Sequence, residues 1–145
     1  MQTEELVEEF LLFRGLRPQQ LADLAPLFSH VTFNEGETIL AQGDPAKTVY
    51  VLEYGQIALR FYPEDGEALA VATLNRGSVF GWSAMLEQPY YTSSAVCLAR
   101  SCTIAIPGEK LRALIQGQPE LSILVGRMAL TVADRQADAP FQTAA

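Results

Sequence analysis

The sequence predicts a mainly β domain flanked by α-helices, and two observations support this prediction. Apolar or alternating runs between residues 31 and 106 are short and separated by turn residues at intervals of about 8–12 residues, as in antiparallel sandwiches and barrels. On both sides of this stretch, apolar residues recur with the spacing of a helix. We therefore expect a single domain over 1–145: N-terminal helices over 1–30, a β-roll over 31–106, C-terminal helices over 107–136 and a frayed tail over 137–145.

The N-terminal region predicts two helices separated by a glycine. The segment EELVEEFLLF begins with acidic residues, which suits the helix dipole, and Gly15 ends it. In RPQQLADLAPLF, Pro18 fits the first turn of a second, short helix. Its apolar residues recur at helical spacing: Leu21, Leu24, Leu27 and Phe28.

The central region predicts seven or eight short strands. The runs are VTF, ETILAQ, TVYVLEY, QIALRFY, EALAVATL, SVFG, TSSAVCLA and CTIAI. The clearest hairpin is QIALRFY–PEDG–EALAVATL, in which a Pro-Glu-Asp-Gly turn joins two alternating runs. Glycines in the other breaks fit sharp turns because glycine adopts positive φ at little cost.

The C-terminal region predicts two helices, GEKLRALIQ and the longer PELSILVGRMALTVADR. One face of the longer helix is apolar: Leu121, Leu124, Val125, Met128 and Val132. This face either packs onto the β-roll or pairs with a second chain, giving a homodimer through residues 118–136. Both interpretations remain open from the sequence.

Charge and composition argue against nucleic acid and membrane as partners. The formal net charge is −7, and a negative surface repels phosphate backbones. The start, MQTEELVEEF, lacks the basic region of a signal peptide, and no stretch approaches the ~18 apolar residues needed to span a bilayer. We therefore expect a cytoplasmic protein.

The residue types give little support for catalysis or for metal binding. The single histidine, His30, lies at a predicted helix-to-strand junction, whereas a metal-dependent β-roll enzyme needs a cluster of histidines and a carboxylate. Cys97 and Cys102 lie in the apolar, strand-like stretch AVCLARSC and are interpreted as small core residues. We expect no enzyme activity, no cofactor and no metal site.

Two stretches resemble a known family. GETILAQGDPAKTVYVLEYGQIAL is similar to the first half of the cyclic nucleotide-binding domain family, of the cyclic-AMP receptor protein type, and GSVFGWSAML resembles its phosphate-binding cassette. The resemblance implies an eight-stranded antiparallel double-stranded β-helix (jelly roll) with N-terminal helices and a C-terminal helix. Regulators of this type carry a helix-turn-helix domain after the long helix; about ten residues follow it here, so we expect the DNA-binding domain to be lacking.

The cassette departs from the family pattern at two positions. Trp82 stands where nucleotide-binding members have a glutamate that accepts a hydrogen bond from the ribose. Ser93, followed by Ser94 and Ala95, stands where they have the arginine that neutralises the cyclic phosphate. Losing one partner of a buried charge pair costs about 2–5 kcal/mol, roughly one to three orders of magnitude in affinity. We therefore expect no tight binding of cyclic AMP.

These observations predict a stand-alone regulatory or sensor module that senses a non-standard small anionic ligand or a protein partner. The alternative is a scaffold or interaction protein with a vestigial, ligand-free pocket. Backbone N–H groups after Gly81, those of Ser83 and Ala84, would face an anion. The residues predicted to line the pocket are Phe80, Gly81, Trp82, Ser83, Ala84, Ser93 and Ser94.

Overall fold

The computed structural model describes residues 10–86 and 90–128, and it confirms the predicted fold class. Eight strands form two antiparallel sheets, the first in the order β1-β8-β3-β6 and the second in the order β2-β7-β4-β5. The strands are β1 (Ser29–Phe33), β2 (Thr38–Leu40), β3 (Thr48–Tyr54), β4 (Ile57–Phe61), β5 (Leu69–Leu74), β6 (Val79–Phe80), β7 (Ser94–Cys97) and β8 (Ser101–Pro107).

The two sheets face each other across an apolar interior, which we call the inner cluster. Both sheets contribute to it: Leu40, Leu52, Ile57, Leu59, Leu74, Phe80, Tyr91, Ala95 and Cys97. The other face of the first sheet packs against the helices in a second, helix-side cluster. Successive side chains of β3 point to opposite faces of the sheet. Leu52 therefore lies in the inner cluster, whereas Val49 and Val51 lie in the helix-side cluster. β3 is therefore buried on both faces of the first sheet.

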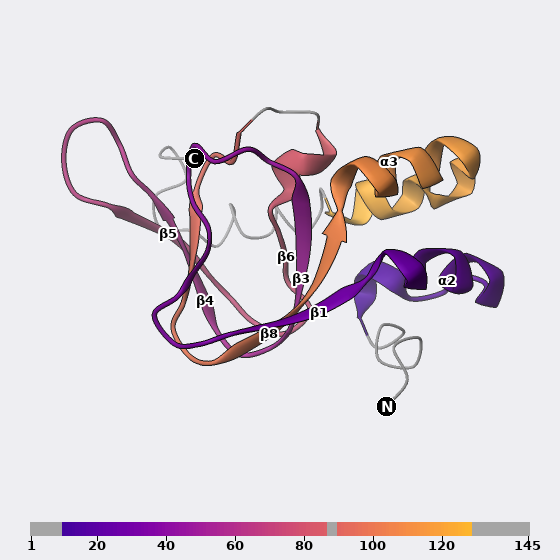
Figure 1. The fold of residues 1–145 in the computed structure, drawn as a ribbon, viewed down its shortest axis with the longest axis horizontal. Coiled ribbons are helices and arrows are strands. Elements are labelled where there is room, and N and C mark those ends of the chain that lie inside the picture. Colours follow the sequence, from indigo (N-terminus) through magenta and orange to yellow (C-terminus); the bar gives the residue numbers. More distant parts are fainter. Residues whose placement is uncertain (1–9, 87–89, 129–145) are drawn as a thin grey trace.

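The predicted hairpin is confirmed as β4–β5. The two strands pair from Ile57↔Leu74 to Phe61↔Leu69, with one irregularity between Leu59 and Arg60. In Figure 1 this hairpin projects from the end of the roll that lies away from α2 and α3. The helices therefore contact the first sheet and leave the hairpin end open to solvent.

Within the described residues, the N-terminal region forms short helical segments. Of the first predicted helix, the described part forms the 3-10 turn η1 (Leu11–Phe13), and its earlier residues lie outside the described ranges. α2 (Pro18–Leu24) begins at Pro18 as predicted and continues as the 3-10 turn η2 (Ala25–Leu27). β1 begins at Ser29 rather than at residue 31, which places His30 within a strand and not at a junction.

The C-terminal region packs onto the domain itself. α3 (Gly108–Gly117) is followed by the 3-10 turn η4 (Pro119–Ser122) and by helical residues 123–128. Leu121, Leu124 and Met128 are fully buried in the helix-side cluster, so the core accounts for this part of the apolar face. Val132 and the predicted tail lie outside the described residues, and the homodimer stays a prediction. No helix within residues 10–86 and 90–128 is long and apolar enough to cross a membrane.

Candidate ligand-binding site

The predicted cassette forms a tight turn between β6 and the 3-10 helix η3 (Trp82–Met85). Gly81 connects them in the left-handed region, with φ 74° and ψ 21°. A Cβ at this position would lie 2.7 Å from the Thr48 carbonyl oxygen and 3.2 Å from Leu40 Cδ2. Glycine is therefore required here twice, because of the backbone conformation and because of the close approach of β3.

The side chains on either side of Gly81 point into different clusters. Phe80 is buried in the inner cluster and stacks on Tyr50, with ring centroids 5.1 Å apart and planes 13° apart. Trp82 is half-buried and packs against the helix-side cluster. The structure therefore separates two residues that were predicted to line one pocket, and Trp82 contributes to the packing of the helices.

Within η3, Ser83 and Ala84 are buried, 8 % and 1 % exposed. The Ala84 N–H donates to the Gly81 carbonyl at 3.2 Å, which closes the turn. Ala84 itself belongs to the helix-side cluster. Of the amides predicted to face an anion, that of Ala84 therefore has a hydrogen-bond partner within the turn.

The second half of the predicted site lies at the start of β7. Ala95 is fully buried in the inner cluster, whereas Ser94, its neighbour, points to the other side of the strand. Ser94 Oγ accepts a hydrogen bond from the Gln42 N–H at 2.8 Å, so it ties β7 to the chain after β2. Ser93 lies in the bend just before β7 and is half-buried.

Tyr91 is a component of the site that the sequence did not single out. Its hydroxyl donates to the Thr48 carbonyl at 2.7 Å and accepts from the Thr48 N–H at 3.0 Å. β6 pairs with β3 only at Tyr50 and Val51, so the hydroxyl satisfies the β3 backbone just beyond that short ladder. Burial is the main cause that raises the pKa of both Tyr91 and Tyr50, so both remain neutral phenols at pH 7.

No sequence signal distinguishes Tyr91 from its neighbour Tyr90. Tyr90 is 56 % exposed and Tyr91 is 8 % exposed, although both follow the same proline. Only the tertiary position of the segment decides which ring enters the roll.

The cassette turn is in direct contact with α3. The Arg112 guanidinium donates to the Ala84 carbonyl, and the Gly108 N–H donates to the Lys47 carbonyl at 2.8 Å. A Cβ on Gly108 would lie 2.9 Å from both the Cβ and the carbonyl oxygen of Ala84. A displacement of η3 therefore acts directly on the first turn of α3.

Two arginines that flank the cassette in sequence do not replace the missing cationic group. Arg76 Nε donates to the Glu53 carbonyl at 3.1 Å, and its guanidinium lies 5.1 Å from the centroid of the Phe10 ring, within the helix-side cluster. Arg100 is exposed beyond the end of β7. Ser93 itself has no charge to offer a phosphate.

Two four-stranded sheets, with a left-handed glycine turn beside the terminal helices, form a jelly-roll domain. Residues 30–118 match the family described as Cyclic nucleotide-binding domain, and the chain belongs to this family. The recognition of the family from its sequence motifs is thereby confirmed.

Similar proteins include a transcriptional regulator and a cyclic AMP receptor protein. The CRP-like cAMP-activated global transcriptional regulator of Mycobacterium tuberculosis is 24 % identical over 82 % of this chain and 53 % of that protein. The Cyclic AMP receptor protein of Thermus thermophilus is 28 % identical over 74 % of this chain and 50 % of that protein. This chain therefore spans about half the length of these relatives.

Among solved structures, a crystal structure from Geobacter metallireducens GS-15 is similar over nearly all of both chains. That protein is provisionally named a cyclic nucleotide-binding protein; it is 26 % identical, with a TM-score of 0.81 over 93 % of this chain and 98 % of the other. The two chains therefore share one architecture from the N-terminal helices to the C-terminal ones.

Proposed function

We propose that this domain is a regulatory sensor that responds to a small anionic ligand, or to a protein partner, and that it does not bind cyclic AMP tightly. The observation that carries the proposal is the contact between the cassette turn and α3. A sensor needs a ligand-facing element that touches an output element, and η3 meets α3 through Ala84, Gly108 and Arg112.

The choice of ligand class rests on what the cassette retains and what it has lost. The glycine-hinged turn is present, and it keeps the backbone conformation that can face an anion. The two side chains that select a cyclic nucleotide in the family are Trp82 and Ser93 here, and Trp82 packs against the helices. The relatives named for cyclic AMP are therefore a guide to the position of the ligand, and the predicted ligand is a different small anion.

The proposed output is a shift of the C-terminal helices. Ligand contact at the Ser83 N–H would shift η3 and with it the Ala84 carbonyl, which is the acceptor for Arg112. α3 leads within a few residues to Leu121 and Leu124, which are buried. A small movement of α3 would shift these residues, and with them the outer surface of the C-terminal helices that a partner protein would contact.

Calorimetric titration with cyclic AMP tests the ligand assignment. We expect no binding at micromolar concentrations by the wild-type chain, and a thermal shift with at least one compound in a panel of small anionic metabolites. Ser93→Arg should strengthen cyclic AMP binding by roughly 10-fold or more, since it returns a cation to the position where nucleotide-binding members of the family have an arginine. Thr92→Arg is the matched control, because Thr92 is exposed and its replacement adds the same charge at the surface.

Two results would overturn the proposal. Micromolar binding of cyclic AMP by the wild-type chain would show that Trp82 and Ser93 do not weaken the site. An equal gain for Thr92→Arg and Ser93→Arg would show that net charge, and not the position of the cation, governs binding.

A second candidate function is a scaffold whose pocket no longer takes a ligand. The stacking of Phe80 on Tyr50, together with the buried Tyr91, favours it because aromatic side chains fill part of the roll interior. The scaffold interpretation predicts no thermal shift with any anion in the panel and a stoichiometric complex with a partner protein. A ligand that shifts the midpoint excludes it.

A further inference from the structure

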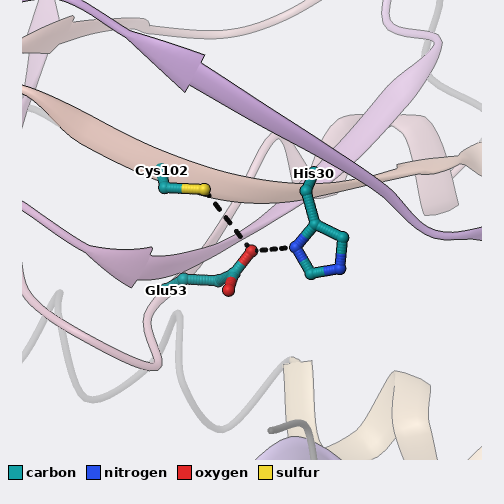
Figure 2. Close-up of side chains that lie close together, drawn as sticks. All are labelled: His30, Glu53 and Cys102. Carbon is teal, nitrogen blue, oxygen red and sulfur yellow. Dashed lines mark hydrogen bonds and ion pairs between the residues drawn. The ribbon is translucent and has the colours of Figure 1, made fainter. Parts of the chain in front are cut away.

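A cluster of three potential metal ligands lies outside the roll interior, on the first sheet. Figure 2 shows His30, Glu53 and Cys102 with their side chains converging on one point. Each offers one ligand atom, and these atoms all lie within 4.8 Å of one another. We propose that this cluster binds a Zn²⁺ ion through His30, Glu53 and Cys102.

The three residues come from three neighbouring strands, β1, β3 and β8. Cys102 pairs with Thr32 in the register of β1 and β8, so His30, two residues before Thr32, lies diagonally across from Cys102 on the same face. Ile104, directly opposite His30, belongs to the helix-side cluster. The cluster therefore lies on the face of the sheet that is turned away from the inner cluster.

An irregularity in β3 brings the carboxylate to this point. Leu52 pairs with Thr103 and Tyr54 pairs with Cys102, so Glu53 is an extra residue between two consecutive positions of the ladder. A β-bulge of this kind changes the direction of a side chain and is frequent beside functional sites. Glu53 is thereby held over Cys102 rather than at the exposed end of the strand.

The Glu53 carboxylate is buried, and a buried carboxylate requires a positively charged partner. Glu53 is 8 % exposed, and buried charges in proteins are paired or coordinate metals. One oxygen, Oε1, is shared by two neighbours: His30 Nδ1 bonds to it and Cys102 Sγ donates to it at 3.6 Å. His30 Nδ1 and Cys102 Sγ thus both face the carboxylate oxygen that would bind a cation.

The ligand types select the metal. An imidazole nitrogen, a carboxylate oxygen and a thiolate sulfur are the donors that Zn²⁺ accepts, at about 2.0–2.3 Å each. Tetrahedral coordination at these distances separates ligand atoms by roughly 3.4 Å. Cys102 Sγ and Glu53 Oε1 are already 3.6 Å apart, whereas His30 Nδ1 and Glu53 Oε1 are in hydrogen-bond contact and need to separate to admit the ion. Binding releases the thiol proton and leaves the imidazole proton on His30 Nε2, so that Nδ1 offers its lone pair; Zn–N, Zn–O and Zn–S bonds then replace the two hydrogen bonds to Glu53.

An ion can reach the cluster from solvent, and three protein ligands leave one coordination position of the ion open. The His30 side chain is 40 % exposed, whereas Glu53 and Cys102 are each 8 % exposed, so an ion would enter on the His30 side. Three protein ligands leave a fourth position for water or for a donor from another molecule. A bound ion would join β1, β3 and β8, which carry one wall of the helix-side cluster.

Cobalt substitution tests the proposal on the full chain. The reduced, chelator-treated protein is titrated with Co²⁺ and then with Zn²⁺, followed by absorption spectroscopy. We expect one equivalent of Co²⁺ to produce a thiolate-to-cobalt charge-transfer band together with the visible bands of four-coordinate cobalt, and one equivalent of Zn²⁺ to abolish both. Even outer-shell partners contribute about 10–100-fold to metal affinity, so Cys102→Ser and His30→Gln should weaken binding by at least that factor.

Cys97→Ser is the matched control, because Cys97 is the other buried cysteine and lies in the inner cluster, away from His30 and Glu53. It should retain the band and the affinity of the wild-type chain. His30→Gln changes a partly exposed residue, so it keeps the test informative if a buried variant fails to fold. Absence of the band in the wild type, its persistence in Cys102→Ser, or its loss in Cys97→Ser with the fold intact would overturn the proposal.

Discussion

Replacing Gly81 by alanine should destabilise the domain more than the same change at any open turn. Alanine in the left-handed region costs about 1–2 kcal/mol. The added Cβ would also lie 2.7 Å from the Thr48 carbonyl oxygen, which belongs to β3 and cannot rotate away. Overpacking of this kind costs about 1–3 kcal/mol, so the free energy of unfolding should fall by roughly 2–5 kcal/mol.

Gly36→Ala isolates the steric part of this effect. Gly36 has φ 86°, close to the 74° of Gly81, but no atom lies within 4 Å of the position its Cβ would take. It should lose only about 1–2 kcal/mol. Any gain from a less flexible unfolded chain applies equally to both substitutions and cancels in their difference.

Urea denaturation followed by circular dichroism measures both variants against the wild type. In a chain of this length each kcal/mol corresponds to about 2–4 °C in the thermal midpoint, so the two variants should be separable by either method. Equal losses for Gly81→Ala and Gly36→Ala, within about 0.5 kcal/mol, would refute the argument. The close approach of β3 to the cassette would then have no energetic consequence.

Three further predictions concern buried polar groups and one surface pair. Tyr91→Phe should lower the free energy of unfolding by about 1–3 kcal/mol, because the Thr48 N–H and carbonyl lose their partner; unchanged stability in urea titrations would contradict this. Stability should also fall above pH 9. Burial raises the folded-state pKa of Cys97 above 9.0 and that of Tyr91 above 10.0, so the unfolded chain releases these protons first; a flat pH profile up to pH 10.5 would be evidence against it. Finally, Arg17→Ala should cost only about 0–1 kcal/mol, since its ion pair with Glu120 is mostly exposed, and a larger loss would show a role beyond that pair.

Local patterning was sufficient to predict the elements of the roll. Each of the eight runs overlaps one of the eight strands, because alternating or apolar runs bounded by turn residues have few other stable conformations. β1 and β8 extend beyond the runs VTF and CTIAI that predicted them. The β4–β5 hairpin followed from a turn that joins two such runs, and α2 followed from Pro18 and its helical apolar spacing. The family motifs then determined how the strands are arranged.

The site was only partly predictable. Gly81 and η3 occur where the motif places them, but the side-chain directions of Phe80 and Trp82 depend on which cluster each face of the turn meets. Ser94 was predicted to face a ligand, yet the alternation of β7 turns it to the Gln42 backbone. The roles of these side chains in ligand binding remain predictions.

The sequence by itself determined the fold, the family and the two departures in the cassette, because these depend on the order of residue types along the chain. Only the tertiary structure decided that Tyr91 completes the β3 backbone and that α3 touches η3 through Arg112. It also brought together His30, Glu53 and Cys102, which are 23 and 49 residues apart in sequence. The pairing of β1, β8 and β3, together with a single bulge in β3, creates that cluster. Neither the choice of partner strands nor their register is encoded in any local sequence pattern.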